Sequence, residues 1–239
     1  MNFFGKKAVL DAFKNKVLKK VYYANDFSEL KEFQSNHIET IKVNKSFFNQ
    51  FDVNHKFIMG VSNQKEFCVE TEFNNFINKV EKHQSNKKII LILDEIQDAG
   101  NFGAICRTCS AFDVCGIVFK KNNQVQINDF VIKTSLGTVN YLNFLKTSNL
   151  NEVVKKLKNN GFWIVCTTLN EKSIALSKFK SDIDKFAIIV GNENNGVSPI
   201  LQKNSDFLIK IDMSNYVQSL NVSVSVGIII YYLLNCLKK

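Results

Sequence analysis

Small and amide-bearing residues gather in the last third of the chain, at positions where a ligand could bind. An apolar run stops at Gly191, and a carboxylate, Glu193, lies in the turn that follows. A second apolar run ends at Met213, and a polar loop then leads to Ser219 and Asn221 before a long apolar stretch. A glycine lets the backbone turn sharply or approach a ligand closely. Two strand ends and one helix start of this composition predict a ligand pocket at the edge of an α/β sheet.

Arg107 is the one arginine among 31 basic residues. Lysine occurs wherever else the chain carries a basic side chain, so an arginine suggests a task that needs the planar guanidinium. Such a group can contact a phosphate or a ribose-phosphate edge with two parallel hydrogen bonds. The alternative interpretation is an arginine that stands on a helix surface by chance.

The elements that would position these residues follow from the apolar pattern. Residues 89–93 form a continuous apolar run, typical of a strand covered on both faces. Other strands are predicted over 116–119, 139–144, 162–167, 186–190 and 207–211, and helices over about 102–112, about 150–159 and 222–237. Because strands alternate with helices, the pattern predicts an α/β fold with a mainly parallel sheet.

Length and charge narrow the class of protein. The chain has 239 residues, 45% of them hydrophobic, which suits one large domain or two smaller ones. A formal net charge of +9 and a pI near 9.2 indicate a polyanionic partner, although a lysine-biased genome would give the same balance. Neither an 18-residue apolar run nor a signal-peptide pattern is present, so we expect a cytoplasmic protein with no membrane segment.

The six cysteines predict buried thiols rather than disulfides or a metal site. Cys106 and Cys109 have C-x-x-C spacing, but they fall in a predicted helix. No second pair and no histidine follow at the spacing of a zinc site. We therefore expect no bound metal.

Three ordered segments resemble the motifs of the SpoU (TrmH-type) RNA 2'-O-ribose methyltransferases. They are LDEIQDAGNFGAICR at 93–107, IIVGNENNGVSP at 188–199, and IKIDM at 209–213 with SLNVS at 219–223. The order and spacing of these motifs over about 130 residues form a more specific signal than a single glycine pattern. By these motifs the chain is identified as a member of this family.

The resemblance implies a fold and a domain order. It implies a SPOUT-type methyltransferase domain at 89–239, whose deep C-terminal trefoil knot would be built from residues 191–221. Knots are exceptions to ordinary chain topology, so the apolar pattern does not predict one. Residues 1–65 resemble the small α/β RNA-binding domain of the RlmB-like subgroup, and 66–88 would be the linker. His55, in that first domain, is interpreted as a structural or RNA-contacting residue rather than a catalytic one.

The resemblance also implies a cofactor and residue roles. S-adenosyl-L-methionine would bind at family positions Gly191, Ile211 and Leu220, with Met213 close by. The implied active-site residues are Asn101, Arg107, Glu193, Ser219 and Asn221. We interpret Asn101 and Ser219 as positioning groups, Asn221 as ordering the pocket, and Glu193 as orienting the substrate or the arginine. A guanidinium stays protonated in proteins, so Arg107 would hold the ribose-phosphate while a phosphate oxygen or water accepts the proton.

Simpler interpretations of the polar residues also exist. Asn101 would be a helix N-cap, and Ser219 with Asn221 would cap the last helix. The leading prediction is 2'-O-methylation of a guanosine in large-subunit ribosomal RNA. Alternatives are a transfer-RNA 2'-O-methyltransferase, a resistance-type ribosomal RNA adenosine methyltransferase, and a non-catalytic RNA-binding ribosome-assembly protein.

The predicted terminal helix suggests an assembly. Residues 222–237 are apolar on more than one face, and one domain edge can cover only one face. The resemblance implies a dimer, so we expect a homodimer that covers the other face.

Overall fold

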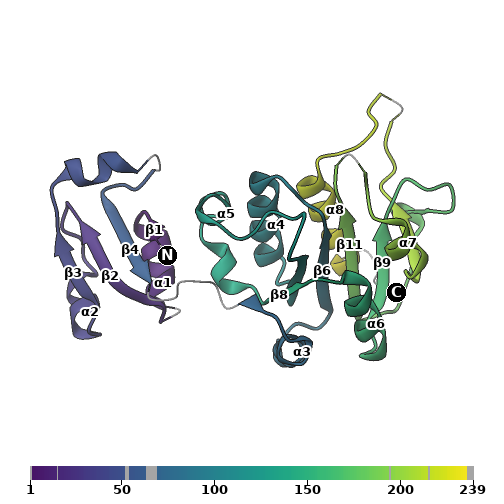
Figure 1. Cartoon of the computed structure of the whole chain (residues 1–239), viewed down its shortest axis with the longest axis horizontal. Coiled ribbons are helices and arrows are strands. Elements are labelled where there is room, and N and C mark those ends of the chain that lie inside the picture. The colour runs from purple at the N-terminus through teal and green to yellow at the C-terminus, as the bar shows by residue number, and fades with distance from the viewer. Residues whose placement is uncertain are drawn as a thin grey trace. The chain divides into compact units, whose positions relative to one another are not determined.

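The computed structural model describes residues 2–14, 16–51, 54–62, 69–193, 195–214 and 216–235 (Figure 1). Contacts divide the chain into two compact units. The first contains residues 1–67 and 127–140, and the second contains 68–126 and 141–239. Within the described residues, no helix is both long and apolar enough to cross a lipid bilayer.

The first unit is a small α/β layer. Its elements are β1 (Asn2–Phe4), α1 (Lys6–Lys14), β2 (Leu18–Tyr23), α2 (Leu30–Ser35), β3 (Glu39–Lys42), the 3₁₀ helix η1 (Lys45–Gln50), β4 (Ile58–Ser62) and α5 (Asp129–Thr134). The strand order is β1-β4-β2-β3. β4 is antiparallel to both of its neighbours, whereas β2 and β3 are parallel. Phe3, Val9, Val21 and Phe33 are buried in its core.

His55 has a structural role in the first unit. Its Nδ1 accepts a hydrogen bond from the backbone N–H of Phe57 at 3.0 Å. Its ring lies 4.8 Å from the ring of Phe48 and 5.2 Å from that of Phe57, measured between centroids. These contacts hold a turn in which Lys56 and Phe57 both have positive φ. His55 therefore packs and caps this turn, in agreement with the structural interpretation of the sequence.

The second unit is organised by a sheet of eight described strands. Its elements are β5 (Val69–Glu70), α3 (Phe73–Lys82), β6 (Lys88–Asp94), α4 (Ala99–Ala111), β7 (Gly116–Lys120), β8 (Phe144–Thr147), α6 (Leu150–Asn159), β9 (Trp163–Thr167), β10 (Ile174–Ala175), η3 (Leu176–Lys178), β11 (Lys185–Gly191), α7 (Pro199–Lys203), β12 (Phe207–Lys210) and α8 (Val222–Asn235). The 3₁₀ helix η2 (Thr138–Tyr141) has residues 138–140 in the first unit and Tyr141 in the second. The strand order is β10-β12-β9-β11-β6-β7-β8-β5, and every pairing is parallel. The predicted parallel α/β fold is confirmed.

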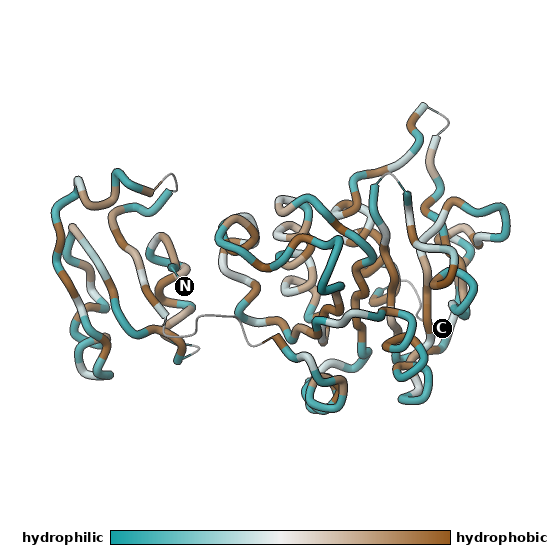
Figure 2. Tube along the Cα trace, viewed as in Figure 1, coloured by the Kyte–Doolittle hydropathy of each residue, from teal (hydrophilic) through white to brown (hydrophobic). Residues whose placement is uncertain are grey.

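The central strands are apolar because helices cover both faces of the sheet (Figure 2). Ile90 and Ile92 of β6 belong to a buried cluster that includes residues of α3, α6 and α7. Alternate residues of a strand point to opposite faces. On the other face, Phe102 of α4 packs against Phe119 of β7 with ring centroids 5.5 Å apart, and α4 also contacts α8.

The range 66–88 contains α3, whose Phe76 and Val80 are fully buried in the core of the second unit. One strand prediction differs from the structure. The strand predicted over 139–144 was wrong. The chain there forms η2, and the strand β8 begins only at Phe144.

Candidate active site

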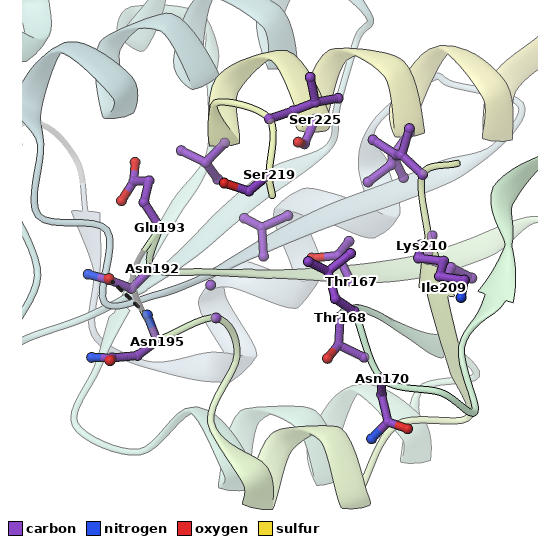
Figure 3. A pocket seen from close by; sticks show the side chains of 18 of the residues that line it. Thr167, Thr168, Asn170, Asn192, Glu193, Asn195, Ile209, Lys210, Ser219 and Ser225 are labelled. Atoms are coloured by element: carbon purple, nitrogen blue, oxygen red, sulfur yellow. Dashed lines mark hydrogen bonds between the residues drawn. The ribbon is translucent and has the colours of Figure 1, made fainter. Parts of the chain in front are cut away.

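A cavity of about 480 Å³ lies at the carboxyl ends of three adjacent strands (Figure 3). Thr167 at the end of β9, Gly191 at the end of β11 and Lys210 at the end of β12 line it, together with residues at the start of α8. All four residues predicted to bind a cofactor line this cavity, namely Gly191, Ile211, Met213 and Leu220. Glu193 and Ser219 also line it. The carboxyl ends of parallel strands are where α/β sheets bind ligands.

Gly191 is a glycine because another part of the loop passes directly over it. A Cβ built on Gly191 would lie 2.1 Å from the carbonyl carbon of Gly196 and 2.3 Å from the nitrogen of Val197. Both atoms belong to the backbone, so neither can relieve the clash by a change of rotamer as a side chain could. Gly196 itself has a φ of 65°, and its N–H donates to the carbonyl of Asn192 at 2.8 Å. The loop is thus folded tightly back on the end of β11.

Residues at the end of β6 hold the same loop from the neighbouring strand. The buried carboxylate of Asp94 accepts a hydrogen bond from the N–H of Ser198 at 2.8 Å. The side-chain amide of Asn192 donates to the carbonyl of Glu95 at 3.0 Å. Glu95 in turn forms an ion pair with Lys120 at 2.6 Å. Asp94, Asn192 and Lys120 were not among the predicted site residues, although Asp94 directly ends a buried apolar run.

A chain of hydrogen bonds connects the loop, α4 and α8. The amide of Asn101 donates to Glu193 Oε1 at 2.5 Å, and Asn101 Oδ1 accepts from the amide of Asn221 at 2.8 Å. Asn221 Oδ1 also accepts from the N–H and the Oγ–H of Ser223, at 2.9 and 2.6 Å. Three of the five predicted active-site residues are therefore joined directly, and Ser223 extends the chain.

Helix capping accounts for only part of these contacts. Asp98, not Asn101, is the N-cap of α4, and its carboxylate accepts from the N–H of Asn101 at 2.6 Å. Asn221 does cap α8, because its side-chain oxygen accepts a backbone N–H of the first turn. Its amide nitrogen is left to reach Asn101. Ser219 lines the cavity and makes no hydrogen bond within the described part of the chain (Figure 3).

Arg107 does not join this group. It is exposed on α4, six residues after Asn101, which places the two side chains about 120° apart around the helix axis. Among the described residues, no hydrogen bond or ion pair of Arg107 is recorded. Its guanidinium is thus available to a group from outside the chain.

The four cysteines that the structure describes are buried thiols. Cys106, Cys109, Cys115 and Cys166 are free and buried. Burial raises the pKa of Cys106 and Cys109 above the ordinary value and raises the pKa of Cys166 to about 12. In the described part of the chain, no cluster of three or more histidine, cysteine or acidic side chains could hold a metal ion.

Comparison with families and curated relatives gives concordant matches. Residues 88–231 match the SpoU rRNA methylase family. A tRNA/rRNA methyltransferase of Mycoplasma genitalium is 45% identical over 188 residues, which cover 77% of this chain and 75% of that protein. A homologue from Mycoplasma pneumoniae is 39% identical over 232 residues, covering 95% of this chain and 94% of the relative.

Solved structures show the same fold. An AdoMet-bound rRNA methyltransferase from Sinorhizobium meliloti superposes with a TM-score of 0.80 at 20% identity, covering 100% of this chain and 88% of that one. The SpoU methyltransferase AviRb of Streptomyces viridochromogenes, in complex with AdoMet, gives a TM-score of 0.77 at 16% identity, with coverage of 97% and 88%. At these identities the likeness concerns the fold.

Proposed function

The chain belongs to the SpoU rRNA methylase family, and from this premise we propose that it catalyses S-adenosylmethionine-dependent 2'-O-ribose methylation of RNA. The observation that carries the proposal is the hydrogen-bonded chain Glu193–Asn101–Asn221 beside the strand-end cavity. This arrangement joins a ligand-sized cavity to a fixed set of polar groups, which is what a transfer reaction between two bound substrates requires.

The cavity suits S-adenosylmethionine by size and by chemistry. Its volume of about 480 Å³ lies in the range of small-molecule sites. Ile211 and Leu220 offer an apolar slot for an adenine ring, and the ends of β11 and β12 offer backbone groups. The absence of a side chain at Gly191 lets the backbone of Gly196 and Val197 pack directly on the strand end that lines the cavity. When bound, the cofactor supplies an electrophilic methyl group on its sulfonium.

The polar residues would orient the ribose. Asn101 is fixed on both sides, because its amide donates to Glu193 and its oxygen accepts from Asn221. This fixed amide holds the Glu193 carboxylate at the cavity wall, where it can accept a hydrogen bond from a 2'-hydroxyl. Exposed Arg107 would hold the adjacent phosphate, and a phosphate oxygen or water would take the 2'-hydroxyl proton, since a guanidinium stays protonated.

The proposed target is a guanosine of large-subunit ribosomal RNA, with residues 1–65 as the RNA-binding domain. The net charge of +9 favours a polyanionic substrate. The curated relatives are named for both RNA classes, so a transfer-RNA target and a ribosomal RNA adenosine remain the alternatives. The trefoil knot through residues 191–221 is proposed on the resemblance, and the cytoplasmic location is proposed on the sequence pattern.

We also propose a homodimer. Val224, Ile228 and Tyr231 lie at helical spacing on α8 and are 49%, 39% and 55% exposed. They form one apolar stripe on the side of α8 away from its buried residues. A two-fold axis at this stripe would bury the same residues of both copies. Light scattering at micromolar concentration should give twice the chain mass, and Ile228→Glu should halve it. A monomeric wild-type mass contradicts the dimer.

Two measurements test the activity. Calorimetric titration with S-adenosylmethionine should show saturable binding. Failure of the folded protein to bind millimolar cofactor would favour a non-catalytic RNA-binding protein. Mapping of 2'-O-methyl groups on ribosomal and transfer RNA, from cells with and without this protein, should show one modification lost. An unchanged map would contradict the proposed reaction in those RNAs.

A further inference from the structure

Tyr216 is an aromatic side chain that the described chain leaves almost wholly uncovered. It is 96% exposed, and its neighbour Val217 is 52% exposed. Both lie in the loop that joins β12 to α8. Isolated apolar residues on a surface are ordinary. Tyr216 differs from such residues because its loop also lines the candidate active site.

The chain itself keeps Tyr216 next to the cavity. Met213 before it and Ser219 after it both line the cavity, and each is three residues away. Because consecutive Cα atoms are 3.8 Å apart, the Cα of Tyr216 lies within roughly 11 Å of either residue. The Tyr216 ring is therefore close enough for contact with a part of a ligand that extends beyond the cavity on this side.

No hydrogen bond within the described part of the chain accounts for this placement. The described loop residues, 213–214 and 216–220, make no hydrogen bond to one another or to the rest of the described chain. The loop from Met213 to Leu220 carries no charged side chain. The ring therefore offers two open π faces rather than an electrostatic contact.

We infer that Tyr216 stacks on an unpaired base of the RNA substrate, next to the nucleotide whose ribose enters the cavity. The inference rests on the proposed function. A ribose inside a strand-end cavity must leave regular helical stacking, so its neighbouring bases lose a stacking partner. An aromatic side chain replaces that partner for any base, because every base has a π face. Cationic side chains elsewhere on the chain would bind the phosphates. The loop from Met213 to Leu220 therefore needs no cationic side chain.

Matched leucine variants test the stacking. The probe is total RNA extracted from cells that lack this protein, with tritium-labelled S-adenosylmethionine as methyl donor. Tyr216→Leu keeps apolar bulk but loses the π face, and should lower kcat/KM for RNA by about 5- to 150-fold. Tyr216→Phe should stay within about twofold of wild type, because it keeps the ring. Trp163→Leu removes an exposed aromatic at the start of β9, opposite the strand end that lines the cavity, and should leave kcat/KM unchanged.

Two further measurements separate the outcomes. Calorimetric affinity for S-adenosylmethionine should be the same in wild type and Tyr216→Leu, which also reports folding. Light-scattering mass should be unchanged as well, whereas a reduced mass would show that Tyr216 contacts a second copy and would overturn the inference. Equal kcat/KM for Tyr216→Leu and wild type would overturn it too. If wild type itself transfers no methyl group to RNA, the proposed function fails first.

Discussion

The side-chain amide of Asn101 donates a 2.5 Å hydrogen bond to the carboxylate of Glu193, although 92 residues separate them in the sequence. The bond joins the first turn of α4 to the loop after β11. It fixes a carboxylate at the cavity wall, and no ion pair of Glu193 is present among the described residues. An amide can do this at any pH, because it does not titrate.

Asn101→Asp should therefore make activity depend on pH in a new way. Two carboxylates would face each other, so the pKa of one is raised, and at neutral pH their repulsion should slow methyl transfer at least tenfold, about 1.4 kcal/mol. As pH falls through the raised pKa, the shared proton restores a hydrogen bond. The variant-to-wild-type rate ratio should rise from pH 8.5 to pH 5.5.

Asn101→Ala is the control for this experiment. It also loses the hydrogen bond, but it introduces no titrating group, so its rate ratio should stay flat over the same range. A flat ratio for Asn101→Asp as well would show that Glu193 is not held by this contact in solution.

Gly191→Ala should disrupt the cavity floor. The added Cβ would lie 2.1 Å from backbone carbon, so the crossing of the chain over β11 must open. Overpacking of this kind costs about 1–3 kcal/mol or more of unfolding free energy. Urea unfolding should show that loss, and calorimetry should show weaker S-adenosylmethionine binding.

Gly227→Ala is a matched control, because its Cβ would lie 3.6 Å from the Thr108 methyl group, an ordinary contact. Within α8 the change should leave stability equal or raise it by up to about 1 kcal/mol. If both variants behaved alike, the close approach at Gly191 would not be a constraint on this fold.

The apolar pattern of the sequence predicted the strands and helices that depend on local hydrophobic periodicity. The apolar run at 89–93 became the buried strand β6, and strand–helix alternation predicted the parallel sheet. The residues that line the cavity were predicted from the family resemblance. Glycine and amide residues alone would not have identified them, because such residues occur in many loops. The strand predicted over 139–144 failed because an apolar segment of that length fits a 3₁₀ turn as well as a strand.

Long-range polar contacts lay beyond sequence reasoning. Asp94 and Ser198 are 104 residues apart, and Asn192 and Glu95 are 97 apart. No periodicity relates such pairs. The choice of helix cap was equally open, because Asp98 and Asn101 are both good N-caps three residues apart, and only the structure shows that Asp98 caps α4.

The buried thiols predict a loss of stability at high pH. Burial raises the pKa of Cys106 and Cys109, and that of Cys166 to about 12, whereas an unfolded thiol titrates near about 8.5. Their stabilisation is thus complete below the unfolded value and is lost as pH rises above it. Each thiol lowers the unfolding free energy by up to about 1.4 kcal/mol per pH unit in that window.

Urea unfolding at pH 8, 9.5 and 10.5 measures this loss. Lysines titrate in the same range, so the comparison is with Cys106→Ala/Cys109→Ala, in which the lysines are unchanged. The double variant should lose stability less steeply with pH than wild type. Parallel slopes would mean that these thiols ionise as readily in the folded state as in the unfolded chain.

Arg107→Lys separates charge from geometry at the exposed face of α4. If Arg107 acts only as a positive charge, lysine should serve equally well, as it does elsewhere in this chain. If it holds ribose and phosphate through two parallel hydrogen bonds, lysine loses that geometry. Loss of a contact made chiefly in the transition state costs about 2–4 kcal/mol, or roughly 30- to 1,000-fold in rate. We expect RNA methylation at least about tenfold slower in single-turnover assays, a cost of about 1.4 kcal/mol.

Cofactor affinity should be unchanged, because Arg107 does not line the cavity. Near-wild-type single-turnover rates would show that the arginine is incidental, and the mechanism would then have to be built on Glu193.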